Sequence, residues 1–165
     1  MALIRRGRMG DENGIHDSHM RSIREICVHD HGEEEIKGWG FRSNRSTEHW
    51  IKTFDDPQIF IWVVEHENII EGHAFLRIAN EQFTAHIHSL YLTPVVLGLG
   101  FGKQLLHEMI DTAKSRGAQE ITLDSSITAH EFYKKYGFVD IGSKRMVDIG
   151  GYPVSSFPMK YTYPS

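Results

Sequence analysis

The sequence has little of what marks a secreted, membrane-bound or nucleic-acid-binding protein. Cys27 is the single cysteine among 165 residues, which excludes an intrachain disulfide and a Cys-rich zinc site. No apolar run approaches the ~20 residues of a membrane span, and the basic stretch 1–8 lacks the hydrophobic segment of a secretory signal. Lys plus Arg is 18 and Asp plus Glu is 22, and the net charge of −4 argues against a nucleic-acid partner. We therefore expect a soluble, cytoplasmic protein with no membrane partner.

Prolines and linkers are also scarce. The five prolines are scattered, and the sequence has no internal repeat, low-complexity tract or Pro/Ser-rich linker. This pattern predicts one domain over residues 1–165, a length that can bury a full core. Histidine, by contrast, is abundant, with 11 residues. Composition alone does not show whether these histidines are metal ligands, acid–base groups or surface residues.

The hydrophobic pattern predicts an α/β or α+β fold with a mixed, mostly antiparallel sheet flanked by helices. Asp11 is the expected N-cap of a helix over 11–29, and the spacing of Thr128 and Glu131 predicts a capping box for a later helix. Pro158 predicts an edge or a bulge in the last strand. The expected strands are 3–6, 58–65, 69–78, 82–92, 120–124, 138–141, 145–149 and 157–163, and the other expected helices are a short one after 35, one near 46–54, one over 105–113 and one near 129–136.

The most informative stretch runs from Leu90 to Lys103, where a strand ends, glycines alternate and a helix begins. Glycines at 98, 100 and 102 let backbone N–H groups face a ligand without side chains in the way. The helix N-terminus adds its partial positive charge. The stretch therefore predicts an anion site, most naturally for a pyrophosphate.

Two well-known phosphate-binding patterns do not fit this loop. A P-loop needs glycine at position 97 and Ser or Thr at 104, whereas the sequence has Leu97 and Gln104. The dinucleotide fingerprint needs glycine where Lys103 stands. On the glycines alone, a tight turn that packs a helix on a sheet without any ligand stays open.

Two motifs together resemble the GNAT acetyltransferase superfamily. Its motif A, Arg/Gln-x-x-Gly-x-Gly/Ala after a strand ending in a Val-x-Pro type sequence, is similar to Leu92-x-Pro94 followed by 97–102. The segment from Ala129 to Phe138 resembles the family's Ala-x-x-Phe-Tyr-x-x-x-Gly-Phe motif. A helix and a strand are predicted between the two motifs, and the order of elements is similar over essentially the whole chain.

The resemblance implies that acetyl-CoA is the co-substrate and that no metal is needed. Three positions depart from the family pattern: Leu97 replaces the usual Arg or Gln, Leu99 stands in a loop interior that is often basic, and Ser126 replaces a frequent Asn. Pyrophosphate binding would then depend on backbone N–H groups from 99 to 103 more than on side chains. The residues that the resemblance assigns to the coenzyme are Leu90, Tyr91, Leu92, Leu97, Gly98, Leu99, Gly100, Phe101, Gly102, Lys103, Ser126, Ala129 and Phe132.

Acetyl transfer to an amine requires amine deprotonation, stabilisation of the oxyanion and protonation of the leaving thiolate. The resemblance implies that the N–H of Leu92 or a neighbour polarises the thioester carbonyl. It also implies that Tyr133 is the general acid; the alternative for Tyr133 is packing within its aromatic stripe.

His86 and His88 are the candidate bases, because residues i and i+2 share one face of a strand and an imidazole suits deprotonation near neutral pH. The pair resembles the histidines of arylalkylamine N-acetyltransferases. A polar strand face without catalytic duty stays open, as does a metal pair, although no third ligand is visible. Among the remaining histidines, His73 stands apart because it lies on the predicted return strand.

The resemblance places the acceptor near residues 28–41 and 143–156. The first segment is acidic and aromatic, which suits a cationic amine, or it is a solvated charge run around a core tryptophan. We predict an acetyl-CoA-dependent N-acetyltransferase acting on a primary amine, of a small molecule or a peptide, by direct transfer in a ternary complex. A non-catalytic acyl-CoA-binding module, motivated by Leu97, and an enzyme for protein N-termini or lysines are the alternatives. The protein is expected to be a monomer or a homodimer.

Overall fold

Eight strands form one sheet within residues 1–164, the range that the computed structural model describes. The strand order is β1-β2-β3-β4-β5-β8-β6, and β7 pairs with β8. The strands are β1 (Ala2–Arg6), β2 (Ile59–His66), β3 (Ile69–Ala79), β4 (Thr84–Leu92), β5 (Glu120–Ser126), β6 (Val139–Asp140), β7 (Arg145–Ile149) and β8 (Tyr152–Thr162). The helices are α1 (Glu12–Ser22), α2 (Val28–His31), α3 (Glu33–Trp39), α4 (Thr47–Asp55), α5 (Phe101–Ser115) and α6 (His130–Lys135), with a π-helical turn at Ile23–Cys27 and a 3₁₀ turn at Asn80–Gln82.

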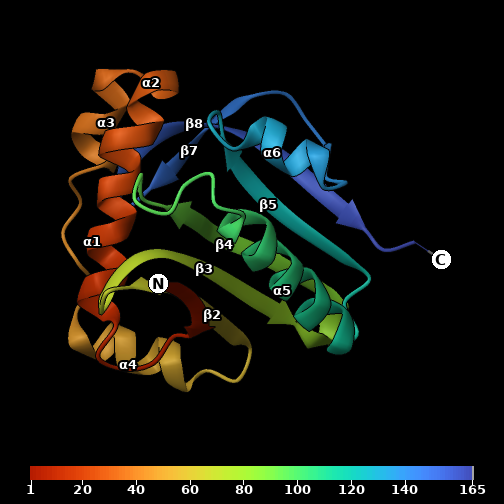
Figure 1. The fold of residues 1–165 in the computed structure, drawn as a ribbon. Helices are drawn as coiled ribbons and strands as arrows, with labels where there is room; N and C mark the ends of the chain where they lie inside the picture. Colours follow the sequence, from red (N-terminus) through yellow and green to blue (C-terminus); the bar gives the residue numbers. More distant parts are fainter. Residues whose placement is uncertain (165) are drawn as a thin grey trace.

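The sheet is mixed and mostly antiparallel, as predicted. Among the described strands, β4 and β5 are the one parallel pair, because α5 crosses between them and returns the chain to the same end of the sheet. Figure 1 shows α5 lying along these central strands, with the loop after β4 reaching toward α1. The two central strands and this loop therefore form the part of the fold where a site can open.

Alternation along the strands divides the buried side chains between two faces of the sheet. Leu76 of β3 and Ile87 of β4 pack in the cluster that includes the apolar stripe of α5, with Leu105 and Met109. A second cluster joins α1 and α4 to the other face through Ile15, Trp50, Ile59, Ile61, Val63 and Ile70. One face is thus closed by α5, and the other is covered only in part by α1 and α4.

The first helix runs further than expected and changes its winding. α1, the π-helical turn and α2 follow one another without a break from Glu12 to His31, where a loop was predicted to begin at 29. The helix ends at Gly32, whose φ of +81° is a conformation that other residues avoid. A π-helical turn holds one more residue than an α-turn, and such turns are frequent at functional sites.

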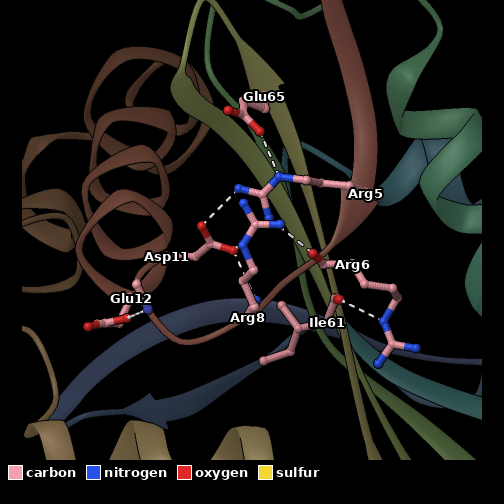
Figure 2. A network of polar contacts seen from close by, with 8 residues as sticks. Arg5, Arg6, Arg8, Asp11, Glu12, Ile61 and Glu65 are labelled. Atoms are coloured by element: carbon pink, nitrogen blue, oxygen red, sulfur yellow. Dashed lines mark hydrogen bonds and ion pairs between the residues drawn. The ribbon is translucent and has the colours of Figure 1, made fainter.

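Polar contacts fix the start of α1 against the sheet. Asp11 is the N-cap residue, as predicted, but its side chain does not cap the helix. Its carboxylate instead accepts two hydrogen bonds from Arg5, at 2.8 and 2.9 Å, and one from the backbone N–H of Arg8 at 2.9 Å. Figure 2 shows Arg5 between Asp11 and Glu65 of β2, whose Oε2 lies 2.6 Å from Arg5 Nε. This network ties β1, β2 and the start of α1 together.

The predicted capping box of α6 is wrong. Ala129 is the N-cap residue, and Thr128 Oγ1 instead donates to Asp30 Oδ2 at 2.8 Å, which links α6 to α2. Ser126 Oγ accepts a hydrogen bond from the N–H of Ala129 at 3.1 Å. A long-range partner has therefore replaced the local contact that the spacing indicated.

Pro158 does not lie in an edge strand, and its pairing with Asp124 of β5 continues without a register shift, so neither the edge nor the bulge of the prediction is found there. β8 runs between β5 on one side and β6 with β7 on the other. β7 pairs with residues 152–156 and β6 with 159–160, so Pro158 falls between the two partners. Its carbonyl accepts from the N–H of Ile141 at 2.9 Å, and the N–H that proline lacks would point to the same side. The hydrogen-bond donor that proline lacks is therefore not needed, because neither β6 nor β7 pairs with β8 at this residue.

Candidate active site

β4 and β5 separate halfway along their length. Their parallel pairing runs from Thr84↔Glu120 to Ile87↔Leu123 and, among the described residues, goes no further. A bulge accompanies the separation, because Leu76 of β3 pairs with Ile87 while Phe75 pairs with Ser89, which leaves His88 as the additional residue. From Ser89 to Leu92 the edge of β4 that faces β5 is therefore open to an extended ligand.

A cleft of about 510 Å³ lies on the α5 side of this opening. Eleven of the thirteen predicted coenzyme residues line it, and Leu99 and Phe101 do not: Leu99 is 64% exposed, and Phe101 packs against the core. The lining residues are Ser22, Ile26, Cys27, Leu90, Tyr91, Leu92, Leu97, Gly98, Gly100, Gly102, Lys103, Ser126, Thr128, Ala129, Phe132, Tyr133, Lys135 and Tyr136.

The glycine loop presents backbone to this cleft. Gly98 and Gly100 have φ of +81° and +91°, and a Cβ at either position would meet nothing within 4 Å. Gly100 is the N-cap of the 15-residue α5, so the free N–H groups of the helix start point out of the loop. At the start of the loop, the buried Thr93 hydroxyl donates to the carboxylate of Glu71, which Arg21 also contacts at 3.1 Å. The loop is thus anchored at its first residue and open at its glycines.

Sequence reasoning missed part of the cleft wall. Lys135 and Tyr136 extend the Phe-Tyr motif by one turn, and their helical spacing from Phe132 could have indicated them. Residues from α1 and the π-helical turn also line the cleft, and no local signal marks them. Among these is the buried Cys27; burial raises the pKa of its thiol to about 11, so it is uncharged at neutral pH.

Tyr133 lies where the cleft meets the gap between the strands. Its side chain is 5% exposed, and it lines both the cleft and a small hollow of about 20 Å³ between β4 and β5. Burial raises the pKa of its phenol, so the hydroxyl is protonated at neutral pH. It can therefore act as a proton donor toward a group in the gap.

A second cavity, of about 520 Å³, lies on the other face of the sheet and is lined by α1, the 42–45 loop, α4, β3, β4 and β7–β8. Six of the 11 histidines, all within the described residues, line it. They come from α1 (His16 and His19), α4 (His49), β3 (His73) and β4 (His86 and His88).

His86 and His88 share the face of β4 that points into this cavity, as their spacing predicts. Their ring centroids lie 4.8 Å apart, and His86 Nδ1 is 2.8 Å from Thr122 Oγ1. Burial lowers the pKa of His88 to about 4, and the neighbouring His86 and Arg77 act in the same direction. Burial also lowers the pKa of His86. Both imidazoles are thus unprotonated at neutral pH and able to accept a proton.

His73 and Ser89 are two further cavity residues close to the gap. The His73 ring is 3% exposed, and its Nε2 lies 2.9 Å from Ser89 Oγ. Burial lowers the pKa of His73 to about 4. Ser89 follows the additional residue of the bulge and lines both the cavity and the small hollow. The strand pattern singles out His73 but gives no sign of Ser89.

The two predicted acceptor segments contribute to the cavity unequally. Trp39 and residues 147–150 and 154–156 line it, whereas the acidic residues at 30 and 33–35 do not. Asp30 bonds Thr128, and Glu35 accepts from Ser155 Oγ at 2.6 Å, so these carboxylates hold the fold together. The acidic residues of the first segment therefore do not line this cavity, whose wall contains the cations Arg42, Arg45 and Arg77.

The cleft and the cavity meet at the opening between β4 and β5. Tyr91 and Ser126 line both, and the small hollow between them is lined by His88, Ser89 and Tyr133. Two molecules held on opposite faces of the sheet can thus approach each other through one gap. Within the described residues, no three His, Cys, Asp or Glu side chains gather as metal ligands do, and no helix is long and apolar enough to cross a membrane.

The family is identified by comparison with known proteins. Residues 27–162 match the description "Acetyltransferase (GNAT) domain", and the chain belongs to this family of acetyltransferase enzymes. Among solved structures, a GCN5-related N-acetyltransferase from Rhodopseudomonas palustris aligns with a TM-score of 0.79 and 22% identity over 99% of this chain and 96% of that one. The PaiA N-acetyltransferase of Thermoplasma acidophilum, in complex with coenzyme A, aligns with a TM-score of 0.74 and 24% identity over 99% of both chains.

Two curated relatives are similar in sequence. The uncharacterized N-acetyltransferase YafP of Escherichia coli is 22% identical over 96% of this chain and 94% of its own length. The glucosamine 6-phosphate N-acetyltransferase of Trypanosoma brucei brucei is 36% identical over 53 residues, which is 32% of this chain and 36% of that protein. The second likeness is therefore local.

Proposed function

We propose that this enzyme transfers an acetyl group from acetyl-CoA to a primary amine, directly and within a ternary complex. The observation that carries the proposal is the pair of cavities that meet at the gap between β4 and β5. Direct transfer requires both substrates at once, on converging paths, with proton-transferring groups at the meeting point. We place the reaction in one domain and in the cytoplasm.

The cleft has the features that acetyl-CoA requires. The open edge of β4 from Ser89 to Leu92 offers backbone groups to an extended pantetheine arm, as an added strand would use them. The glycine loop and the start of α5 offer N–H groups to the pyrophosphate, and Lys103 and Lys135 add positive charge. The coenzyme A complex of the Thermoplasma acidophilum protein, which has the same fold, supports this assignment.

The transfer forms a C–N bond between the amine and the acetyl carbonyl and breaks the C–S bond of the thioester. The attacking amine loses one proton, which we assign to His88 or His86, directly or through a water molecule. The backbone N–H of Leu92 or a neighbour polarises the carbonyl oxygen. Tyr133 returns a proton to the leaving thiolate. The proton taken up by the histidine returns to the Tyr133 phenolate through solvent, so the products are the acetylated amine and free CoA and the enzyme is regenerated.

The proposal is tested by thermal shift with acetyl-CoA and with CoA, followed by an amine panel scored by release of free thiol. We expect stabilisation by both coenzymes and thiol release with at least one amine. Binding without release for every small amine and peptide would favour a non-catalytic acyl-CoA module. That reading draws on Leu97, a 51% exposed apolar residue in a loop that binds an anion. No stabilisation by either coenzyme would overturn both.

A further inference from the structure

The acceptor cavity holds an arginine whose charge the fold leaves without a partner. Arg42 lines the cavity and is half-buried, and its Nε donates to the carbonyl of Trp39 at 2.9 Å. Within residues 1–164, no carboxylate lies within 4 Å of its guanidinium, and burial lowers its pKa. A half-buried cation without a counterion is unfavourable in the free protein, because it loses hydration and gains no ion pair.

The other charges of the cavity leave its wall with a positive excess. Arg77 is paired with Asp56 at 3.3 Å, and Asp124 with Arg145 at 2.8 Å. Asp148 keeps one negative charge, with its Oδ1 accepting from the N–H of Gly151 at 3.0 Å, against the two arginines of the 42–45 loop. Arg45 lies near Arg42 in the chain, is exposed and adds a second cation to the same wall. The wall formed by the 42–45 loop therefore carries positive charge that faces the cavity.

Four buried polar atoms in the cavity wall have no hydrogen-bond partner among the described residues. They are His19 Nε2, Trp39 Nε1, His73 Nδ1 and Ser156 Oγ. The Trp39 indole can only donate, as can the guanidinium of Arg42, whereas the histidines and the serine can donate or accept. These atoms are fully buried behind the cavity lining, so a ligand in the cavity meets the charge of Arg42 and Arg45 rather than these groups.

We propose that the acceptor is a small amine that also carries an anionic group, a carboxylate or a phosphate, and that Arg42 binds this group with Arg45 beside it. The inference rests on the proposed function, since it names the substrate class of the same site. The amine lies at the gap beside His88, and the anionic group lies at the 42–45 wall. A cavity of about 520 Å³ is of the size that holds one small molecule. A polyamine would bring only donors and more positive charge to this wall.

The test uses matched pairs of amines that differ in the anionic group alone. One arm compares an α-amino acid with its amide, and the other compares an aminoalkyl phosphate with the corresponding amino alcohol. A linear polyamine and a lysine peptide complete the panel. We expect kcat/KM to be at least about tenfold higher for the anionic member of one pair, since hydrogen bonds to charged groups are worth about 1.5–3 kcal/mol and each 1.4 kcal/mol is tenfold. The arm that responds distinguishes carboxylate from phosphate.

Variants assign the preference to Arg42. Arg42→Gln is expected to lower kcat/KM for the anionic amine by about 10- to 100-fold and that for its neutral partner far less, so the preference collapses, whereas Arg42→Lys retains part of it. Lys114→Gln, an exposed cation on α5 outside both cavities, is the matched control and should change neither. Stabilisation by acetyl-CoA checks that each variant is folded. If Arg42→Gln fails that check, Arg45→Gln takes its place with a smaller expected loss.

The outcomes separate this inference from the proposed function. Equal or better turnover of the neutral amines, the polyamine or the peptide would overturn the anionic acceptor and leave the acetyltransferase proposal standing. An absence of thiol release with every amine would overturn the proposed reaction instead. In that case, calorimetry measures whether the anionic amines bind to the complex of the protein with CoA. Binding that is lost in Arg42→Gln would support the anion site, and the absence of binding would overturn it.

Discussion

The coenzyme cleft and the acceptor cavity have nearly the same volume, about 510 and 520 Å³, but they are built in different ways. The anion-binding part of the cleft is made of backbone: two glycines at positive φ, a helix start and an open strand edge. The cavity is lined by residues of three helices (α1, α3 and α4), of five strands (β3, β4, β5, β7 and β8) and of the 42–45 loop, and six of the lining residues are histidines. Under the proposed function, the coenzyme is thus held mainly by backbone groups, and the acceptor is selected by side chains.

The first prediction tests the comparison by lowering the pH, because the cavity contains buried histidines and the cleft does not. His73 is buried, and its pKa lies near 4, below its ordinary value of 6.5. Between these pH values the unfolded chain takes up the proton and the folded chain does not, so stability falls as pH falls through this window. The expected loss from His73 is on the order of 3 kcal/mol.

Urea unfolding at pH 7, 5.5 and 4.5 measures this loss. His73→Gln should flatten the fall, while His107→Gln, an exposed residue of α5 outside both cavities, should not. The lining of the coenzyme cleft contains no histidine, so this loss of stability is expected to arise on the cavity side of the sheet. Equal slopes for the two variants would contradict the assignment to His73.

The second prediction concerns the point where the two regions meet. Tyr133→Phe removes the hydroxyl group and keeps the aromatic ring. Turnover should therefore fall by about 100-fold, while the Kd for acetyl-CoA stays within about twofold. Single-turnover kinetics and calorimetry measure the two quantities. Tyr161→Phe, on β8 and outside both cavities, should leave turnover unchanged. An unchanged rate in Tyr133→Phe would remove the general-acid role.

The third prediction tests whether the cleft depends on backbone. Gly100 and Gly117 stand at opposite ends of α5 with φ of +91° and +87°, and neither has an atom within 4 Å of a Cβ position. Alanine at either should cost about 1 kcal/mol of stability. Gly100→Ala should also weaken acetyl-CoA binding by about tenfold, because its methyl group covers the N–H groups at the helix start. Equal coenzyme affinity in the two variants would show that the loop does not bind the pyrophosphate.

The last prediction concerns the start of α1, outside both regions. Asp11→Asn removes a charge that bonds Arg5 twice and should lower the free energy of unfolding by about 1–2 kcal/mol. The double variant Arg5→Gln/Asp11→Asn tests whether the two residues stabilise the protein together. If the stability losses of the two single variants simply add in the double variant, the coupling is contradicted. Because the network lies at the start of α1, we expect a larger effect on stability than on acetyl-CoA affinity. Glu48→Gln, an exposed partner of Lys52 at 3.1 Å, is the control and should change stability by less than about 0.5 kcal/mol.

The sequence predicts the coenzyme cleft better than the acceptor cavity. The order of elements and the sheet type are confirmed, because period-2 and period-3.6 patterns are local. Eleven coenzyme residues line the cleft because two contiguous motifs contain them. Arg42, Ser89 and His19 could not be found this way, since three separate elements bring them to one cavity. The capping box of Thr128 and the edge position of Pro158 failed for the same reason: a partner far along the chain decides each.

The π-helical turn at Ile23–Cys27 lets one continuous helical segment serve both regions. Upstream of it, His16 and His19 line the cavity, and within it Ile26 and Cys27 line the cleft. The wider turn takes up one residue more than an α-turn over nearly the same rotation about the helix axis, so the segments on its two sides keep their relative orientation. Removing one residue from α1, where the winding is already α-helical, would instead turn one side by about 100° relative to the other. A deletion within Ile23–Cys27 should thus disturb the two substrate sites less than a deletion within Glu12–Ser22.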